Sequence, residues 1–183
     1  MILAISGSTR RLSSNLGLIN AIAELFKNTI HIKIFNQISK IDHFNPDLDN
    51  EYLPEKVSEF RKELLATDGI LICTPEYAMG VPGTLKNAID WTLSSTVFAQ
   101  KPVALITAST AGQKGHQSLL DTLRVIEADI PDSSQLIVSH IRAKLEKNRI
   151  TDPQLESKVI DVIESLINSI ERKINREKLY RDT

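Results

Sequence analysis

The sequence is poor in cysteine and has no excess of charge of either sign. Its one cysteine, Cys73, cannot form a disulfide within the chain, so a reducing compartment, the cytoplasm, is the expected location. The 22 lysine and arginine residues are balanced by 23 aspartate and glutamate residues, for a formal net charge of -1. Without an overall positive field, we expect no nucleic-acid partner.

Long apolar runs and low-complexity segments are also missing. No apolar run approaches the roughly 20 residues that a membrane-spanning helix requires, and the first residues, MILAISGSTR, are not expected to act as a secretory signal. Hydrophobic residues make up 42% of the chain and charged residues 25%, which is typical of a globular domain. We therefore predict one domain over residues 1–183 and no membrane partner.

What is present is an alternation of short apolar segments with segments that carry apolar residues at helical spacing. This alternation predicts a parallel sheet, and right-handed crossovers favour a doubly wound sheet with helices on both faces. Thr151 and Gln154 are expected to form a capping box at the start of the last helix. The predicted strands are 2–6, 31–35, 69–74, 102–108 and 136–139, and the fourth helix is predicted over about 117–127.

The glycines point to one edge of this sheet. In doubly wound sheets, ligands bind beyond the carboxyl ends of the strands, where the strand order reverses. Glycine allows the backbone to approach a ligand closely, although a single glycine usually marks only a turn. Because several glycines share this edge, we predict a ligand site there. The glycines that follow the first, third and fourth predicted strands are Gly7, Gly80, Gly83, Gly112 and Gly115.

The loop after the first strand leads into the N-terminus of a helix, where free N–H groups and the helix dipole favour an anion. Ser8, Ser13 and Asn15 can add donors, and the guanidinium of Arg10 matches phosphate oxygens. Ser13 or Ser14 could instead only cap the helix. Capping does not require an arginine, so phosphate binding is favoured. The loop matches neither G-x-G-x-x-G nor G-x-x-x-x-G-K-[ST], which argues against a dinucleotide or nucleoside triphosphate site.

The loop after the third strand is stiffened by Pro75 and Pro82, and its exposed backbone could line the rim of a flat ring. Tyr77 could pack against that ring, although a rim or subunit contact is an equally good interpretation of this tyrosine alone. The loop at 108–115, after the fourth strand, is small and polar and could wrap a ligand edge with main-chain groups. Trp91 is expected in the core or at a subunit contact.

Two motifs resemble those of the NADPH-dependent FMN reductase family. G-S-x-R-x-x-S-x-N follows the first strand, and P-E-Y-x-x-G-x-P-G-x-L-K-N-A-I-D-W spans 75–91. The resemblance implies a flavodoxin-like fold with a five-stranded sheet. It also implies an FMN site, in which Ala78 replaces an asparagine common in the family and Met79 could instead shape the substrate face. The implied FMN-binding residues are Ser8, Arg10, Ser13, Ser14 and Asn15 at the phosphate, Pro75, Glu76, Tyr77, Ala78 and Met79 at the isoalloxazine ring, and Ser109, Thr110 and Gly112 at its far edge.

The function that the resemblance implies is hydride transfer from NADPH or NADH to FMN, and then to a small-molecule electron acceptor. That acceptor could be free flavin, a quinone, an azo compound or a metal oxyanion. Because the flavin carries the chemistry, no catalytic side chain is nominated. Family members are commonly dimers or tetramers, so a homodimer or homotetramer is expected, with Trp91 and the loop of Tyr77 as candidate contacts.

The alternative is a flavodoxin-type electron carrier without nicotinamide turnover. Such carriers are strongly acidic and shield their flavin between aromatic residues, whereas only Tyr77 lies in a candidate flavin loop here and the net charge is -1. A regulatory or scaffold protein that keeps the fold without flavin is a third interpretation.

Other chemistries lack the residues that they need. A Cys-x5-Arg phosphatase would require an arginine where Met79 stands, so the thiol of Cys73 is expected to be an inert core group. The four histidines have no metal-ligand spacing, and we expect no metal site. The acidic residues Asp47, Asp49 and Glu51 lack the pattern of a calcium loop and are expected to be solvated.

Overall fold

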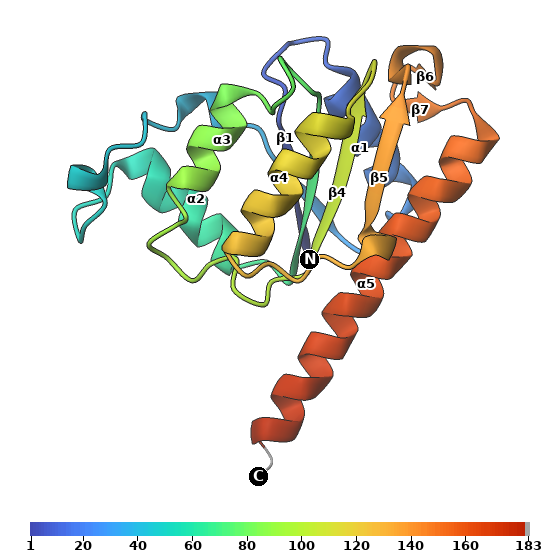
Figure 1. The fold of residues 1–183 in the computed structure, drawn as a ribbon. Coiled ribbons are helices and arrows are strands. Elements are labelled where there is room, and N and C mark those ends of the chain that lie inside the picture. The colour runs from blue at the N-terminus through green and yellow to red at the C-terminus, as the bar shows by residue number, and fades with distance from the viewer. Residues whose placement is uncertain (182–183) are drawn as a thin grey trace.

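Five parallel strands form the central sheet of the computed structural model, which describes residues 1–181 (Figure 1). The strand order is β2-β1-β3-β4-β5, and every neighbouring pair is parallel. The predicted doubly wound five-stranded sheet is therefore confirmed, with its order reversing between β1 and β3. The strands are β1 (Ile2–Ser6), β2 (Ile32–Phe35), β3 (Gly69–Thr74), β4 (Val103–Ser109) and β5 (Gln135–Ser139).

Helices cover both faces of the sheet, each over its own apolar core. On one face, α2 (Glu55–Leu65), α3 (Gly83–Asp90) and α4 (Gln113–Val125) pack on side chains such as Leu3 and Ile72. On the other face, α1 (Ser14–Leu25) and α5 (Pro153–Arg181) pack on the alternate side chains of the same strands, such as Ala4 and Leu71. The fully apolar runs of β1 and β3 are thus explained by burial on both faces.

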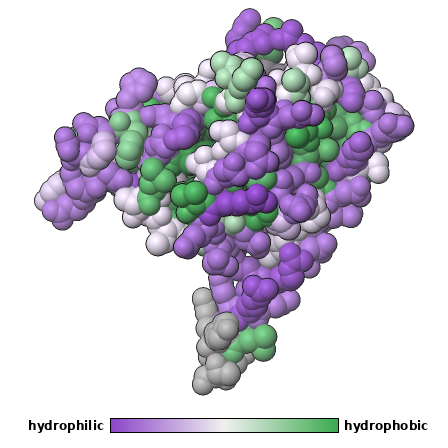
Figure 2. Space-filling view, in the orientation of Figure 1, coloured by the Kyte–Doolittle hydropathy of each residue, from purple (hydrophilic) through white to green (hydrophobic). Residues whose placement is uncertain are grey.

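The helix α5 continues past the edge of the sheet (Figure 1). Its apolar stripe is buried as far as Ile170, and the end of the helix beyond is mostly hydrophilic (Figure 2). No helix within residues 1–181 combines the length and the apolar character needed to cross a membrane.

Three local predictions need correction. The helix α4 begins at Gln113 rather than near Gln117, because a carboxylate from another loop caps it, as described below. The cap of α5 is Asp152, whose Oδ1 accepts from the N–H of Leu155 at 2.8 Å, so Thr151 and Gln154 form no capping box. A small hairpin, β6 (Leu145–Glu146) and β7 (Arg149–Ile150), was not predicted. The 3₁₀ helices are η1 (Ile38–Lys40), η2 (Pro46–Leu48), η3 (Asp132–Ser134) and η4 (Ile141–Ala143).

Of the two positions predicted for Trp91, the core is confirmed and the subunit contact is wrong, because this side chain is fully buried within the chain. Its Nε1 donates to the carbonyl of Asp42 at 2.7 Å, and its ring meets that of Phe44 edge-on, with centroids 5.1 Å apart. Asn87 accepts from the N–H of Phe44 at 2.7 Å. Asn87 and Trp91, at the end of the motif that spans 75–91, therefore attach the segment 42–44 to α3.

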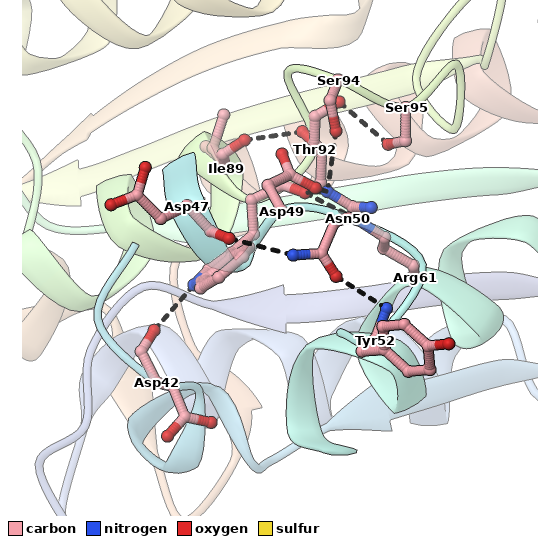
Figure 3. A network of polar contacts seen from close by, with 11 residues as sticks. Asp42, Asp47, Asp49, Asn50, Tyr52, Arg61, Ile89, Thr92, Ser94 and Ser95 are labelled. Atoms are coloured by element: carbon pink, nitrogen blue, oxygen red, sulfur yellow. Dashed lines mark hydrogen bonds and ion pairs between the residues drawn. The ribbon is translucent and has the colours of Figure 1, made fainter. Parts of the chain in front are cut away.

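Asp49 is also not solvated as predicted (Figure 3). Its carboxylate accepts from Arg61 at 2.7 Å, and the side chain is only 8% exposed. Arg61 additionally donates from Nε to the carbonyl of Trp91 at 2.7 Å and from its guanidinium to Ser94 Oγ at 3.1 Å. Burial raises the pKa of Asp49, but hydrogen bonds with Ser94 and Arg61 outweigh burial and leave that pKa lowered.

Candidate functional site

A cavity of about 440 Å³ lies at the carboxyl ends of β1, β3, β4 and β5. Its walls come from the four loops that follow these strands, as expected for a ligand site in a doubly wound sheet. The lining residues are Ser8, Arg10, Ser13, Ser14, Asn15, Pro75, Glu76, Tyr77, Ala108, Ser109, Thr110, His140, Ile141, Arg142 and Ala143.

The structure brings most of the predicted site residues together here and places three outside the walls. Ala78 and Met79 form the tip of a turn, where the side chain of Met79 is 68% exposed. Gly112 precedes α4 with a φ of +102°. Ala108 belongs to the predicted loop at 108–115, whereas the segment 140–143 was not predicted, because the prediction followed the glycines and this segment has none. The fifth predicted strand ends at residue 139, and parallel strands end at the same edge of a sheet. This rule could have predicted that the segment 140–143 borders the site.

The first loop is held close to β3 before it enters α1. The N–H of Gly7 donates to the carbonyl of Cys73 at 2.9 Å, and a Cβ on Gly7 would lie 2.3 Å from Thr74 Oγ1. Ser13 caps α1, because its Oγ accepts from the N–H of Leu16 at 3.3 Å. The first N–H groups of the helix have no acceptor within it and carry its positive dipole end. Ser13 therefore has the capping role and also lines an anion-favouring cavity.

Asn15 forms part of the cavity floor and is almost fully buried. Its Nδ2 donates to the carbonyl of Ala108 at 3.2 Å, and its Oδ1 accepts from Cys73 Sγ at 3.2 Å. The side chain thus joins α1 to β3 and β4. Burial raises the pKa of the Cys73 thiol, so the prediction of an inert core thiol is confirmed.

The second loop forms a tight two-residue turn. The main chains of Tyr77 and Gly80 exchange two hydrogen bonds, each 2.9 Å long. Ala78 and Met79 between them both have positive φ, +49° and +63°, which is the geometry of a type I′ turn. The side chain of Tyr77 is 47% exposed at the cavity rim.

Glu76 fixes this loop to α4. Its Oε2 accepts from the N–H of Gly115 at 2.7 Å, in the first turn of the helix, where a carboxylate also interacts favourably with the dipole. A Cβ on Gly115 would lie 2.7 Å from the carbonyl of Gly80. The loop and the helix are therefore in direct contact, and this contact needs glycine.

The charged groups of the cavity favour an anion. Arg10 and Arg142 line it, and neither guanidinium has an ion pair within residues 1–181. Glu76 is the one carboxylate among the lining residues, and it is engaged by Gly115. Within the described residues, no three histidine, cysteine, aspartate or glutamate side chains are grouped to hold a metal ion.

Comparisons with known proteins agree on one family. Residues 1–143 match the family model of NADPH-dependent FMN reductase. The chain is 27% identical to NADH-dependent flavin reductase subunit 2 of Lactobacillus johnsonii, over 92% of this chain and 94% of that protein. It is 30% identical to 2-hydroxy-1,4-benzoquinone reductase of Burkholderia sp, over 80% of this chain and 82% of that protein.

A solved structure with a similar fold is the flavoenzyme FerB, an NAD(P)H:acceptor oxidoreductase from Paracoccus denitrificans. The TM-score is 0.82 at 24% sequence identity, and the match covers 93% of this chain and 97% of FerB. The predicted flavodoxin-like fold is confirmed.

Proposed function

The chain belongs to the NADPH-dependent FMN reductase family, and we propose that it passes hydride from NAD(P)H, through FMN bound in the cavity, to a quinone or a flavin. Family membership confirms the predicted enzyme class, an NAD(P)H-dependent oxidoreductase with FMN as cofactor. Relatives named flavin reductase and 2-hydroxy-1,4-benzoquinone reductase support the two acceptor classes.

The phosphate end of the cavity carries this proposal. Arg10 has no carboxylate partner within residues 1–181, and it stands beside the first turn of α1 with its free N–H groups. Ser8, Ser13 and Ser14 add hydroxyl groups to the same wall. These donors fit a phosphate monoester, which carries a charge of about -1.5 to -2 at pH 7.

The remaining walls fit a flat ring. Bound FMN supplies the redox chemistry, because its ring accepts a hydride and passes two electrons on. Pro75, Glu76 and Tyr77 would border the ring with main-chain groups held rigid by the contact of Glu76 with Gly115. Tyr77 would cover part of the ring and exclude water from it. Ser109 and Thr110 would bound the far edge, with Gly112 shaping their loop.

The two residues at the tip of the turn, Ala78 and Met79, would face the second substrate. The exposed thioether of Met79 would then contact the acceptor or the nicotinamide. The choice between NADPH and NADH stays open in this proposal.

Arg10→Ala tests the phosphate assignment. Loss of a charge-assisted contact of about 1.5–3 kcal/mol should weaken FMN binding roughly tenfold to 150-fold. Affinity for riboflavin, which lacks the phosphate, should hardly change. Arg11→Ala is the matched control, since Arg11 neighbours Arg10 but does not line the cavity. Calorimetric titration of both ligands decides, and an unchanged ratio of the two affinities in Arg10→Ala would refute the assignment.

Turnover separates the proposed enzyme from the electron carrier. FMN-loaded protein should oxidise NADPH or NADH in the presence of a benzoquinone or free flavin, measured at the nicotinamide absorption band. A carrier would bind FMN but show almost no oxidation without a partner reductase. Absence of turnover with both coenzymes and both acceptor classes would contradict the enzyme.

The proposal also includes a homodimer or homotetramer in the cytoplasm. Exposed apolar side chains in the first and second cavity loops support the oligomer, since such side chains are often covered at subunit contacts; they are Leu12, Tyr77 and Met79. The single cysteine supports the cytoplasm. Light scattering on the FMN-loaded protein at micromolar concentration should show more than one copy. A monomer would count against this part of the proposal.

A further inference from the structure

Arg142 lies on the cavity wall that follows β5. The N–H of His140 donates to the carbonyl of Ser109 at 2.9 Å, which ties this segment to the end of β4. His140 has a φ of +56°, and η4 begins directly after it. Ile141 is buried in the core. The hydrogen bond from the N–H of His140 and the buried side chain of Ile141 thus fix the segment that carries Arg142.

The chain after Arg142 packs against the first turn of α1. Leu145 and Asn148 belong to the β6–β7 hairpin segment, and a Cβ on Gly17 would lie 3.3 Å from Asn148 Oδ1 and 4.0 Å from Leu145 Cδ1. The N–H of Thr151 closes the hairpin by donating to the carbonyl of Lys144 at 2.9 Å. The segment of Arg142 is therefore a neighbour of the helix end at which Arg10 and the serines stand.

A second cation beside Arg10 and the N-terminus of α1 would complete the charge balance of a bound phosphate. A phosphate monoester carries about two negative charges at pH 7, and Arg10 supplies one positive charge. Arg142 lines the same cavity, and its guanidinium has no ion pair within residues 1–181. No lining carboxylate competes for it, because Glu76 is engaged by Gly115 on another wall.

We propose that Arg142 is a second phosphate-binding arginine, which forms a two-sided clamp with Arg10 on the phosphate monoester of FMN. This inference rests on the proposed function, because it requires FMN in the cavity with its phosphate at α1. The planar guanidinium groups can each bind two phosphate oxygens. Phosphate groups also occur in the nicotinamide coenzymes, so the experiment separates the two sources.

The experiment titrates FMN and riboflavin into flavin-free protein carrying Arg142→Ala, Arg142→Lys or Arg149→Ala. Arg142→Ala should weaken FMN binding at least tenfold and change riboflavin binding less than twofold. Arg142→Lys should restore part of the loss, because a lysine keeps the charge but not the two-pronged contact. Arg149→Ala should bind FMN as the wild type does, since Arg149 is exposed on the β6–β7 hairpin that follows η4 and lines a different cavity.

Two further outcomes are informative. If Arg142→Ala keeps the wild-type ratio of FMN to riboflavin affinity but raises KM for NADPH or NADH, the clamp is refuted and Arg142 belongs to the coenzyme. An unchanged ratio and unchanged KM would also refute it. Circular dichroism of each variant checks folding, and Arg142→Lys keeps the test valid if the alanine variant is unfolded. A wild-type protein that binds no FMN would overturn the proposed function together with the clamp.

Discussion

Replacing Glu76 by alanine should affect both the stability of the protein and the ring side of the FMN cavity. The carboxylate of Glu76 caps α4 at 2.7 Å from the N–H of Gly115, although 39 residues separate the two. Gly112, at the capping position itself, has no side chain to replace it. Loss of a helix cap costs about 0.5–2 kcal/mol.

The size of the effect can be measured by thermal unfolding. A loss of about 0.5–2 kcal/mol corresponds to a decrease in Tm of roughly 1–8 °C for a chain of this length. Glu76→Gln keeps an oxygen acceptor but loses the interaction of charge with the helix dipole, about 0.3–1 kcal/mol, so its Tm should lie between those of the wild type and Glu76→Ala. Glu146→Ala is the matched control, because Glu146 is exposed and forms no ion pair within the described residues.

Ligand binding distinguishes the role of Glu76 from that of Arg10. Glu76 fixes the main chain that would border the ring, so Glu76→Ala should weaken FMN and riboflavin by the same factor. Arg10→Ala should weaken FMN alone. The reasoning is refuted if Glu76→Ala melts at the same temperature as Glu146→Ala, or if it changes the ratio of FMN to riboflavin affinity.

Three other predictions concern stability. Replacing Ala78-Met79 by Asn-Gly should raise the free energy of unfolding by about 1 kcal/mol in urea titrations, because both residues have positive φ; a decrease would contradict the type I′ assignment. Burial lowers the pKa of His116 despite a hydrogen bond with Gln135. The unfolded chain therefore binds its proton more readily, and stability should fall as pH drops below about 6.5, by at most about 1.4 kcal/mol per pH unit. His116→Gln should flatten that decline in Tm, and an unaltered slope would count against it. The lowered pKa of Asp49 stabilises the fold above about pH 4, and this contribution is lost as pH falls through the folded pKa; Asp49→Asn should reduce the loss of Tm in acid, and a profile parallel to the wild type would disprove the role of this ion pair.

Much of the fold was predictable because its signals are local. The mostly apolar runs at 2–6, 69–74 and 102–108 indicate central strands, since a short strand buried on both faces is apolar along most of its length. The regular alternation with helical segments then implies parallel pairing, and parallel strands bring their carboxyl ends to one edge. That edge, and the assignment of Arg10 and the turn of Tyr77 to it, follow from spacing along the chain.

The tertiary structure decided what depends on residues far apart in the sequence. Glu76 caps α4, and Asn87 anchors the segment after η1, through contacts that no local pattern reports. The sequence left Trp91 open between the core and a subunit contact and predicted a solvated Asp49, whereas packing buries Trp91 and Arg61 pairs with Asp49. Such contacts depend on the register of the strands and on the position of each helix on the sheet. Hydrophobic periodicity determines neither of these. The fourth cavity wall has the same origin. The segment of Arg142 reaches the cavity because β5 pairs with β4, and the β6–β7 hairpin that follows packs against α1.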